Sequence, residues 1–165
     1  MPVQIGDKLP DIKLKRLGAN GMEEIQTADY FKNKKVVLFA TPGAFTPTCA
    51  QKHLPGYVSN ADKIKSEGVD EIICLSVNDP FVMKHWGEIA GTEGKVTMLP
   101  DGNGEFVEAL GLNFDGSGAG LGKRSKRFSA IVENGIIKDL QVEEAPGQLE
   151  LSGAEVCMLR LKQVS

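Results

Sequence analysis

The chain has 165 residues, and its 19 Lys and Arg against 22 Asp and Glu give a formal net charge of −3 at pH 7. With 41% hydrophobic and 25% charged residues, the composition is typical of one globular domain over residues 1–165 and excludes collagen-like and disordered chains. The mildly acidic balance provides no overall attraction to nucleic acid or anionic lipid, and no stretch approaches the roughly 18 apolar residues of a membrane span, so we expect no partner of either kind.

The first thirty residues predict two short strands around an Asn20-Gly21 turn, followed by a short helix. The apolar run at 36–40 is unbroken rather than alternating, which predicts a strand buried on both faces of a sheet. From about Cys49 to Ser66 apolar residues recur every third or fourth position, as in a helix. We expect Pro55 to kink that helix, because proline removes a backbone donor.

A second β-rich run covers residues 69–77. Asp79-Pro80 then reads as an N-cap and a first-turn proline, which predict another helix. We expect its buried face to carry Val82, Trp86, Ile89 and Ala90. Because strand and helix have alternated twice, the pattern favours right-handed βαβ units in an α/β sheet.

The middle of the chain is less regular. Residues 100–104 are turn-rich, residues 104–110 suggest a short helix, and residues 115–122 form a glycine-rich loop. The segments 128–133 and 136–142 flank Asn134-Gly135 and predict an antiparallel hairpin.

At the C-terminal end, Ser152 and Glu155 have the spacing of a capping box that opens a helix to about Leu161. The whole order is β-α-β-α, then a β-hairpin, then a helix. We therefore predict a thioredoxin-like α/β fold, with a central mixed β-sheet flanked by helices and an N-terminal β-hairpin extension.

Cys49 ends the segment TPGAFTPTC, which follows the first buried strand and opens a helix. Ligands of α/β sheets bind beyond the carboxyl ends of strands. With Thr46 as the cap and Pro47 in the first position, Cys49 lies in the first turn, near unpaired backbone N–H groups and the positive end of the helix dipole. Both favour the thiolate, so we predict that Cys49 is reactive.

A helix terminus alone does not make a cysteine mostly ionised. An ordinary cysteine is about 3% thiolate at pH 7, and reaching about 90% requires about 3.4 kcal/mol, whereas a helix terminus provides about 0.3–2 kcal/mol. A fixed cation should supply the rest. The candidates are Lys52 and His53, close along the helix, and the distant basic run 123–127. His53, like His85, is more typical of a surface or structurally satisfied histidine than of a ligand or base.

The sequence around the other two cysteines predicts a structural role for them. Cys74 lies within the apolar run 72–75 and is expected in the core, and Cys157 on the C-terminal helix is expected in the core or partly exposed. A disulfide reductase needs C-x-x-C, but Thr46 stands where the first cysteine would be. The cysteine spacings also fit no zinc site, and the glycines at 116–120 complete no dinucleotide fingerprint.

The cysteine content also bears on location. Three cysteines are too few and too widely spaced for a disulfide framework, and MPVQIGDKLP has neither the basic start nor the apolar stretch of a secretory signal. We expect a reducing compartment and a cytoplasmic protein, unless an organellar transit peptide has been removed.

Pro42, Thr46 and Cys49, spaced P-x-x-x-T-x-x-C within TPGAFTPTCAQKHLPGYV, resemble the active-site signature of the peroxiredoxins. The flanking sequence is most similar to the type II, peroxiredoxin-5-like class. Further blocks that resemble this class are SVNDPFVMKHW (76–86), LPDGNGEF (99–106) and KRFSAIVENGIIKDLQVE (126–143). The resemblance therefore extends over almost the whole chain.

The resemblance implies a thiol peroxidase that reduces hydrogen peroxide and organic hydroperoxides. Cys49 corresponds to the peroxidatic nucleophile, which becomes a sulfenic acid. Thr46 corresponds to the threonine that orients the peroxide, Pro42 to the proline that shields the site, and Arg127 to the arginine that pairs with the thiolate. No metal or organic cofactor is implied.

Some members of the class resolve the sulfenic acid with a second cysteine before the last helix, but residues 146–151 contain none. We therefore predict a one-cysteine enzyme recycled by glutathione or glutaredoxin, with thioredoxin as an alternative reductant. The resemblance also implies a homodimer, for which Phe45 and Phe81 are the apolar candidates. Two alternative functions are a peroxide-responsive redox sensor that uses the same cysteine and a thioredoxin-like binding module. The presence of all four site residues disfavours the binding module.

Overall fold

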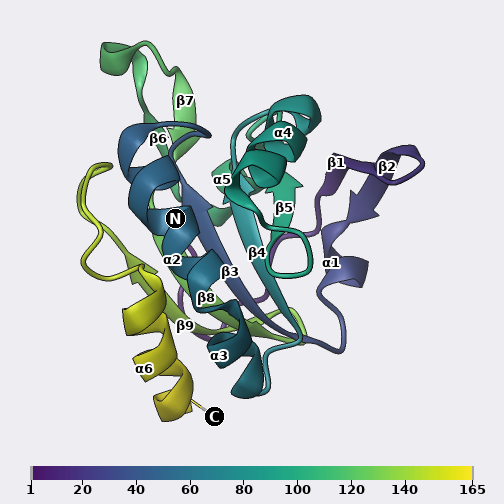
Figure 1. The fold of residues 1–165 in the computed structure, drawn as a ribbon, viewed down its shortest axis with the longest axis vertical. Helices are drawn as coiled ribbons and strands as arrows, with labels where there is room; N and C mark the ends of the chain where they lie inside the picture. Colours follow the sequence, from purple (N-terminus) through teal and green to yellow (C-terminus); the bar gives the residue numbers. More distant parts are fainter. Residues whose placement is uncertain (1, 165) are drawn as a thin grey trace.

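The computed structural model describes residues 2–164, and a five-stranded mixed sheet lies at its centre (Figure 1). The strands in sheet order are β5 (Thr97–Pro100), β4 (Glu71–Ser76), β3 (Lys35–Thr41), β8 (Phe128–Glu133) and β9 (Ile136–Val142). β3, β4 and β5 are parallel, whereas β8 is antiparallel to both β3 and β9. The prediction of a thioredoxin-like α/β fold with a mixed sheet is confirmed.

Helices and the N-terminal hairpin cover the two faces of this sheet. The helices are α1 (Thr27–Tyr30), α2 (Leu54–Ser59), α3 (Ala61–Ser66), α4 (Pro80–Ala90), α5 (Glu105–Leu110) and α6 (Ala154–Val164). One hydrophobic cluster joins α2, α3, α4 and α6 to the sheet, and a second joins α1, α5 and the hairpin to the opposite face. No helix within residues 2–164 is long and apolar enough to cross a membrane.

The central strand β3 contributes to both clusters. Val37 and Phe39 pack in the first cluster, whereas Val36 and Leu38 pack in the second, and all four side chains are buried. Successive side chains of a strand point to opposite faces, so burial on both sides requires an unbroken apolar run. The strand predicted at 36–40 is confirmed.

The N-terminal hairpin consists of β1 (Lys13–Gly18) and β2 (Gly21–Gln26). Gly18 pairs with Gly21, so the turn residues are Ala19 and Asn20, one position earlier than predicted. Gly21, with a φ of +111°, already belongs to the returning strand. In the second hairpin, β8–β9, Asn134 and Gly135 form the turn as predicted, with φ values of 52° and 77°; positive φ at both positions is what a type I′ turn requires.

The helix predicted from Cys49 to Ser66 is divided into three parts. A π-helical turn, η1 (Cys49–His53), precedes α2, and Asn60 separates α2 from α3. The Leu54 N–H bonds the carbonyl of Cys49, five residues back. Pro55, which has no N–H to donate, follows directly. The helix is therefore irregular in two places, in the π-helical turn before Pro55 and at Asn60.

α4 begins as predicted, with the Asp79 carboxylate accepting a hydrogen bond from the Val82 N–H and Pro80 in the first turn. Its buried face is carried by Met83, Trp86 and Gly87. The prediction that Ile89 belongs to this face is wrong, because its side chain is 65% exposed. Two residues beyond Gly87, it points about 200° around the helix.

Three short elements were not predicted as strands. β5, β6 (Asn113–Asp115) and β7 (Lys123–Ser125) have three or four residues each, and β6 and β7 flank the glycine-rich loop with its 3₁₀ turn η2 (Ser117–Ala119). Runs this short give almost no periodic signal.

The predicted capping box is also wrong. The Ser152 hydroxyl donates to the Glu143 carboxylate at 2.7 Å, and the Gly153 carbonyl accepts the hydrogen bond from the Cys157 N–H at the start of α6. The helix continues to Val164, beyond the predicted Leu161. The consequence for the site is that Ser152 is tied to Glu143, just after β9, rather than to its own helix.

Candidate active site

The loop after β3 places Cys49 in the first helical turn. Residues 47 and 48 are already helical, and the Ala50 N–H bonds the Thr46 carbonyl at 2.8 Å, so Thr46 holds the cap position as predicted. Its hydroxyl, however, donates to the Gly43 carbonyl at 2.7 Å. The hydroxyl oxygen therefore faces any further group as a hydrogen-bond acceptor. The Cys49 side chain is fully buried.

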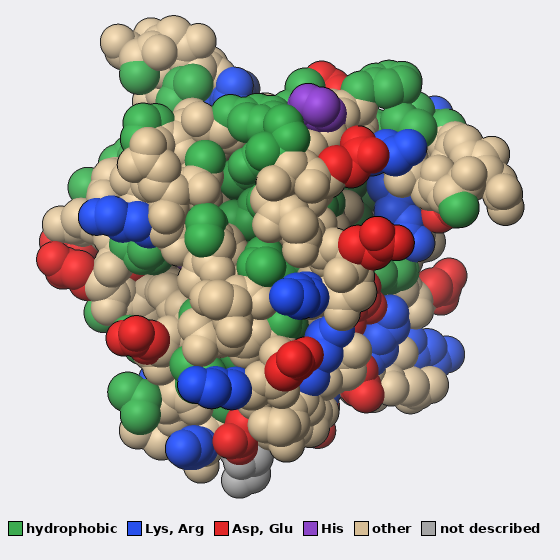
Figure 2. Space-filling model, viewed as in Figure 1, with side chains coloured by type: hydrophobic (Ala, Val, Ile, Leu, Met, Phe, Trp, Pro, Cys, Tyr) green, Lys and Arg blue, Asp and Glu red, His purple; other side chains and the backbone are tan. Residues whose placement is uncertain are grey.

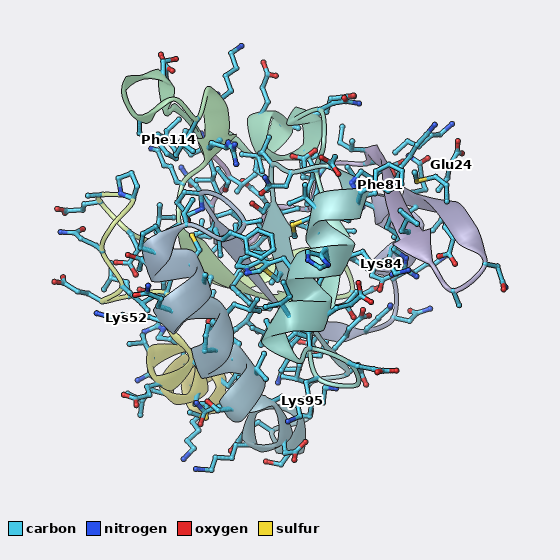
Figure 3. All side chains as sticks on the ribbon, turned by 45° about the horizontal axis from the view of Figure 1, so that its top comes forward. Glu24, Lys52, Phe81, Lys84, Lys95 and Phe114 are labelled. Carbon is cyan, nitrogen blue, oxygen red and sulfur yellow. The ribbon has the colours of Figure 1, made fainter. Side chains whose placement is uncertain are left out.

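Arg127 is the cation that meets Cys49. Its Nη2 lies 3.1 Å from the Cys49 Sγ, and the side chain is only 2% exposed. A guanidinium donor at this distance in a buried site is placed to form a charge-assisted hydrogen bond with an ionised sulfur. Of the other candidates, Lys52 and Lys126 are exposed, and Lys52 points outward from its helix (Figure 3).

Other hydrogen bonds fix the guanidinium in one orientation. Nε and Nη2 donate to the Pro146 carbonyl at 3.1 and 2.9 Å, and Nη1 donates to His53 Nδ1 at 2.8 Å. With the contact to Cys49, these bonds use four of the five N–H groups of the side chain. The fifth, on Nη1, makes no hydrogen bond within residues 2–164 and is available to a ligand.

Strand pairing explains why Arg127, and not its neighbours, reaches the site. Phe128, the first residue of β8, pairs with Ala40 of β3, so Arg127 lies level with the end of β3. Side chains alternate along this segment: Ser125 and Arg127 are buried, and Lys126 between them is exposed.

His53 belongs to the same cluster, although its sequence suggested only a surface or satisfied histidine. It is buried, and its Nε2 lies 3.0 Å from the Ser152 carbonyl. Burial and the neighbouring Arg127 charge lower the pKa of His53 to about 3. The ring is therefore neutral near pH 7, donating from Nε2 to Ser152 and accepting from Arg127 at Nδ1. His85, in contrast, is exposed.

Pro42 is the first residue of the loop after β3. It is buried, and its carbonyl lies 3.5 Å from Arg124 Nη1. Neither Pro42 nor Thr46 is hydrogen-bonded to the Cys49 sulfur within the described chain. Asn78, which the sequence did not single out, fixes the loop by accepting the Ala44 N–H at 2.9 Å. The sequence signal for Asn78 was its place just after β4, at the same edge of the sheet as the end of β3.

The other two cysteines are core residues. Cys74 lies in β4 between Phe39 and Met98, and Cys157 lies in α6; both side chains are buried and all three cysteines are free thiols. Burial raises the pKa of Cys74 well above its ordinary value and that of Cys157 to about 12. Both are therefore protonated near pH 7 and are poor nucleophiles.

Comparisons with known proteins agree with this arrangement. The Redoxin family model matches residues 4–156. Peroxiredoxin-2E, chloroplastic, from Arabidopsis thaliana is 44% identical over 157 residues, which cover 93% of this chain and 67% of the relative. Peroxiredoxin-2C from Oryza sativa subsp. japonica is 44% identical over 155 residues, 93% of this chain and 95% of the relative.

Solved structures lead to the same family. Reduced Prx3 from Vibrio vulnificus, in complex with hydrogen peroxide, is 47% identical and superposes with a TM-score of 0.92, covering 96% of this chain and 99% of that one. Sequence, fold and the buried cysteine–arginine pair agree: the chain belongs to the Redoxin family and, within it, to the peroxiredoxins of the type II, peroxiredoxin-5-like class.

Proposed function

We propose that this peroxiredoxin reduces hydrogen peroxide and organic hydroperoxides through a sulfenic acid on Cys49 and is recycled by an external thiol, glutathione or glutaredoxin. The observation that carries the proposal is the 3.1 Å contact between Arg127 Nη2 and the Cys49 Sγ in a buried site. The similarity to a protein whose structure holds hydrogen peroxide supports the substrate class.

The first half-reaction is a displacement at oxygen. The Cys49 thiolate attacks one peroxide oxygen, the O–O bond breaks, and its electron pair leaves with the other oxygen as hydroxide or alkoxide, which is protonated to water or alcohol. The sulfur retains the attacked oxygen as a sulfenic acid. Sulfur is oxidised by two electrons and the peroxide is reduced by two.

The surrounding residues have distinct proposed roles. Arg127 stabilises the thiolate, and its remaining Nη1 N–H stabilises the charge that develops on the leaving oxygen. The Thr46 hydroxyl, which donates to Gly43, accepts the hydrogen of the bound peroxide and so fixes its orientation. The buried Pro42 shields the Cys49 sulfur from water.

Recycling requires a thiol from outside the chain. A glutathione thiolate attacks the sulfenic sulfur, and hydroxide leaves as water, which gives a mixed disulfide on Cys49. A second thiol, from glutathione or glutaredoxin, then attacks the glutathione sulfur and releases the Cys49 thiolate. Cys74 is held in a strand and Cys157 in a helix. Because a disulfide requires Cα atoms within about 7 Å, we assign recycling to an external thiol rather than to either of these cysteines.

Steady-state peroxide reduction with glutathione plus glutaredoxin, compared with thioredoxin and its reductase, tests this proposal. We expect sustained turnover with the first system and slower turnover with the second. A sulfenic acid that forms rapidly but turns over with neither would point to a redox sensor, and faster turnover with thioredoxin would reassign the reductant.

Thr46→Val should slow peroxide reduction by about a hundredfold, because it removes an oriented partner of the reacting oxygens. The fold should change little, because the Gly43 carbonyl keeps its contact with the Thr46 N–H at 3.3 Å. Thr46→Ser retains the hydroxyl and is the matched control. Equal rates for the valine and serine variants, measured by single-turnover kinetics, would reduce Thr46 to a structural role.

We also propose a homodimer that covers Phe45 and Phe81, which are 46% and 65% exposed. Phe45 lies 6.2 Å from His85 and 6.1 Å from Trp86 between ring centroids, and hydrophobic side chains gather beside the surface histidine in Figure 2. Phe45→Glu should raise the dimer dissociation constant in sedimentation experiments. Leu159→Glu, at an exposed position on α6, is the control; a wild-type chain that stays monomeric at high concentration would contradict the proposal.

We propose further that residues 1–165 form one domain and work in the cytoplasm. The family match over residues 4–156 and the single sheet that serves both hydrophobic clusters support one domain. Three free thiols suit a reducing compartment. A chloroplast, as in the name of the Arabidopsis relative, is the alternative that cell fractionation would distinguish.

A further inference from the structure

A strap formed by residues 144–151 joins β9 to α6 and lies beside α2 (Figure 1). The Pro146 carbonyl in this strap accepts two hydrogen bonds from Arg127, and the Gly147 carbonyl lies 3.5 Å from the Thr48 hydroxyl. The strap therefore contacts both the guanidinium and the segment that carries Cys49.

Glu143, the residue just before the strap, ties the strap's far end. It is 4% exposed, and its carboxylate accepts hydrogen bonds from the backbone N–H groups of Glu150, Leu151 and Ser152 and from the Ser152 hydroxyl, at 2.7–3.2 Å. Its own N–H bonds the Arg127 carbonyl at 2.9 Å. One buried side chain thus closes the strap into a loop directly beside Arg127.

The charge of Glu143 is held by these donors alone, since no salt bridge to it exists within residues 2–164. Burial raises the pKa of Glu143, but the Ser152 hydroxyl and the backbone N–H groups outweigh burial and lower the pKa below its ordinary value. The carboxylate is therefore ionised near pH 7, and its hydrogen bonds are of the strong, charge-assisted kind.

Two chains of contacts lead from Glu143 to Arg127. In one, the Ser152 carbonyl receives the His53 Nε2–H, and His53 Nδ1 receives the Arg127 Nη1–H. In the other, the strap delivers the Pro146 carbonyl to Nε and Nη2. Both acceptors that orient the guanidinium depend on the loop that Glu143 closes.

The strap also holds the group that contacts the sulfur, because Pro146 accepts from the same guanidinium that donates to Cys49. Cys49 has no exposed surface, so a small peroxide is far better suited to reach it than a tripeptide such as glutathione. A glutathione sulfur that attacks the sulfenic acid needs room beside Arg127, and the strap is one of the segments that hold Arg127 in place. The two half-reactions therefore place opposite demands on the strap.

We propose that Glu143 is a positioning residue that, by clamping the strap, speeds peroxide reduction and slows access of the thiol reductant. This inference rests on the proposed recycling by glutathione. Glu143 touches neither peroxide nor Cys49 and acts through Pro146, Ser152 and His53.

Glu143→Gln tests the clamp, because it removes the negative charge that strengthens these hydrogen bonds and places an N–H donor where Oε1 faced the Glu150 N–H. We expect sulfenic acid formation, followed by rapid quench and mass spectrometry, to slow about tenfold as Arg127 loses its fixed orientation. Conversion of preformed sulfenic acid to the glutathione mixed disulfide should become about tenfold faster, because the strap opens more often. Glu144→Gln, the same change at the exposed neighbour, should alter neither rate.

Hydrogen exchange of the amides of residues 150–152 gives a readout that is independent of activity, and it should be faster in Glu143→Gln than in Glu144→Gln. Ser152→Ala removes one donor only and should give the same opposite changes at smaller size, which keeps the test decisive if the glutamine variant fails to fold. Both rates falling together, both unchanged, or unchanged exchange would overturn the clamp. A wild-type chain that forms no sulfenic acid or no glutathione mixed disulfide would instead overturn the proposed function.

Discussion

Cys49→Ser should abolish peroxide reduction, whereas the double variant Cys74→Ser/Cys157→Ser should retain most glutathione-dependent activity. Cys49 is the cysteine whose sulfur contacts a guanidinium. Burial raises the pKa of Cys74 well above its ordinary value and that of Cys157 to about 12, so neither provides a thiolate near pH 7. Steady-state assays of the three proteins at equal concentration measure the difference.

The double variant also tests recycling. To reach Cys49, Cys74 would have to leave the middle of the sheet, where β3 and β5 flank it, and Cys157 would have to unwind the first turns of α6. Either motion disrupts buried packing and is too costly for rapid turnover. A single Ser variant at 74 or 157 that loses activity would contradict the one-cysteine mechanism while leaving the peroxidase function intact.

Arg127→Met should slow peroxide reduction by about a thousandfold. The substitution removes both the donor that contacts the Cys49 sulfur and the N–H that we propose faces the leaving oxygen, and one donor lost at a developing charge already costs about 10²–10³ in rate. Second-order rates of peroxide reduction, with circular dichroism to check folding, measure the effect.

Lys126→Met is the matched control, because it removes a cation from the adjacent, exposed position. Its rate should stay within about twofold of wild type at moderate salt, since an exposed charge is largely screened. Similar losses in both variants would mean that Arg127 acts only as part of a diffuse basic patch, and the proposed role of the fixed guanidinium would be wrong.

Elements with a strong local signal could be predicted from the sequence. The run at 36–40 is apolar without a break, and Asn134-Gly135 suits only a tight hairpin turn, so β3 and β8–β9 were placed correctly. β6 and β7 exist through pairing between two segments on either side of a loop, from Asn113 with Ser125 to Asp115 with Lys123, rather than through their own composition. Short strands of this kind are determined by tertiary contacts that no local pattern reports.

The candidate site divides in the same way. Cys49 and Thr46 were predicted from the strand-loop-helix pattern, but Arg127 was one of several cations in a basic run until the family resemblance singled it out. His53 joins the site through a partner 74 residues away. The sequence pattern places Ser152 in a local capping box, yet its N–H and hydroxyl both donate to the carboxylate of Glu143, which follows β9. Contacts between distant segments decide these roles.

Mass spectrometry after one equivalent of hydrogen peroxide tests the proposed chemistry most directly. The reduced protein is treated once without and once with glutathione, quenched, and mapped at its three cysteines. We predict a sulfenic acid on Cys49 in the first sample and a glutathione mixed disulfide on Cys49 in the second, with Cys74 and Cys157 still reduced. An intramolecular Cys49–Cys74 or Cys49–Cys157 disulfide in most molecules, or oxidation that spares Cys49, would contradict it.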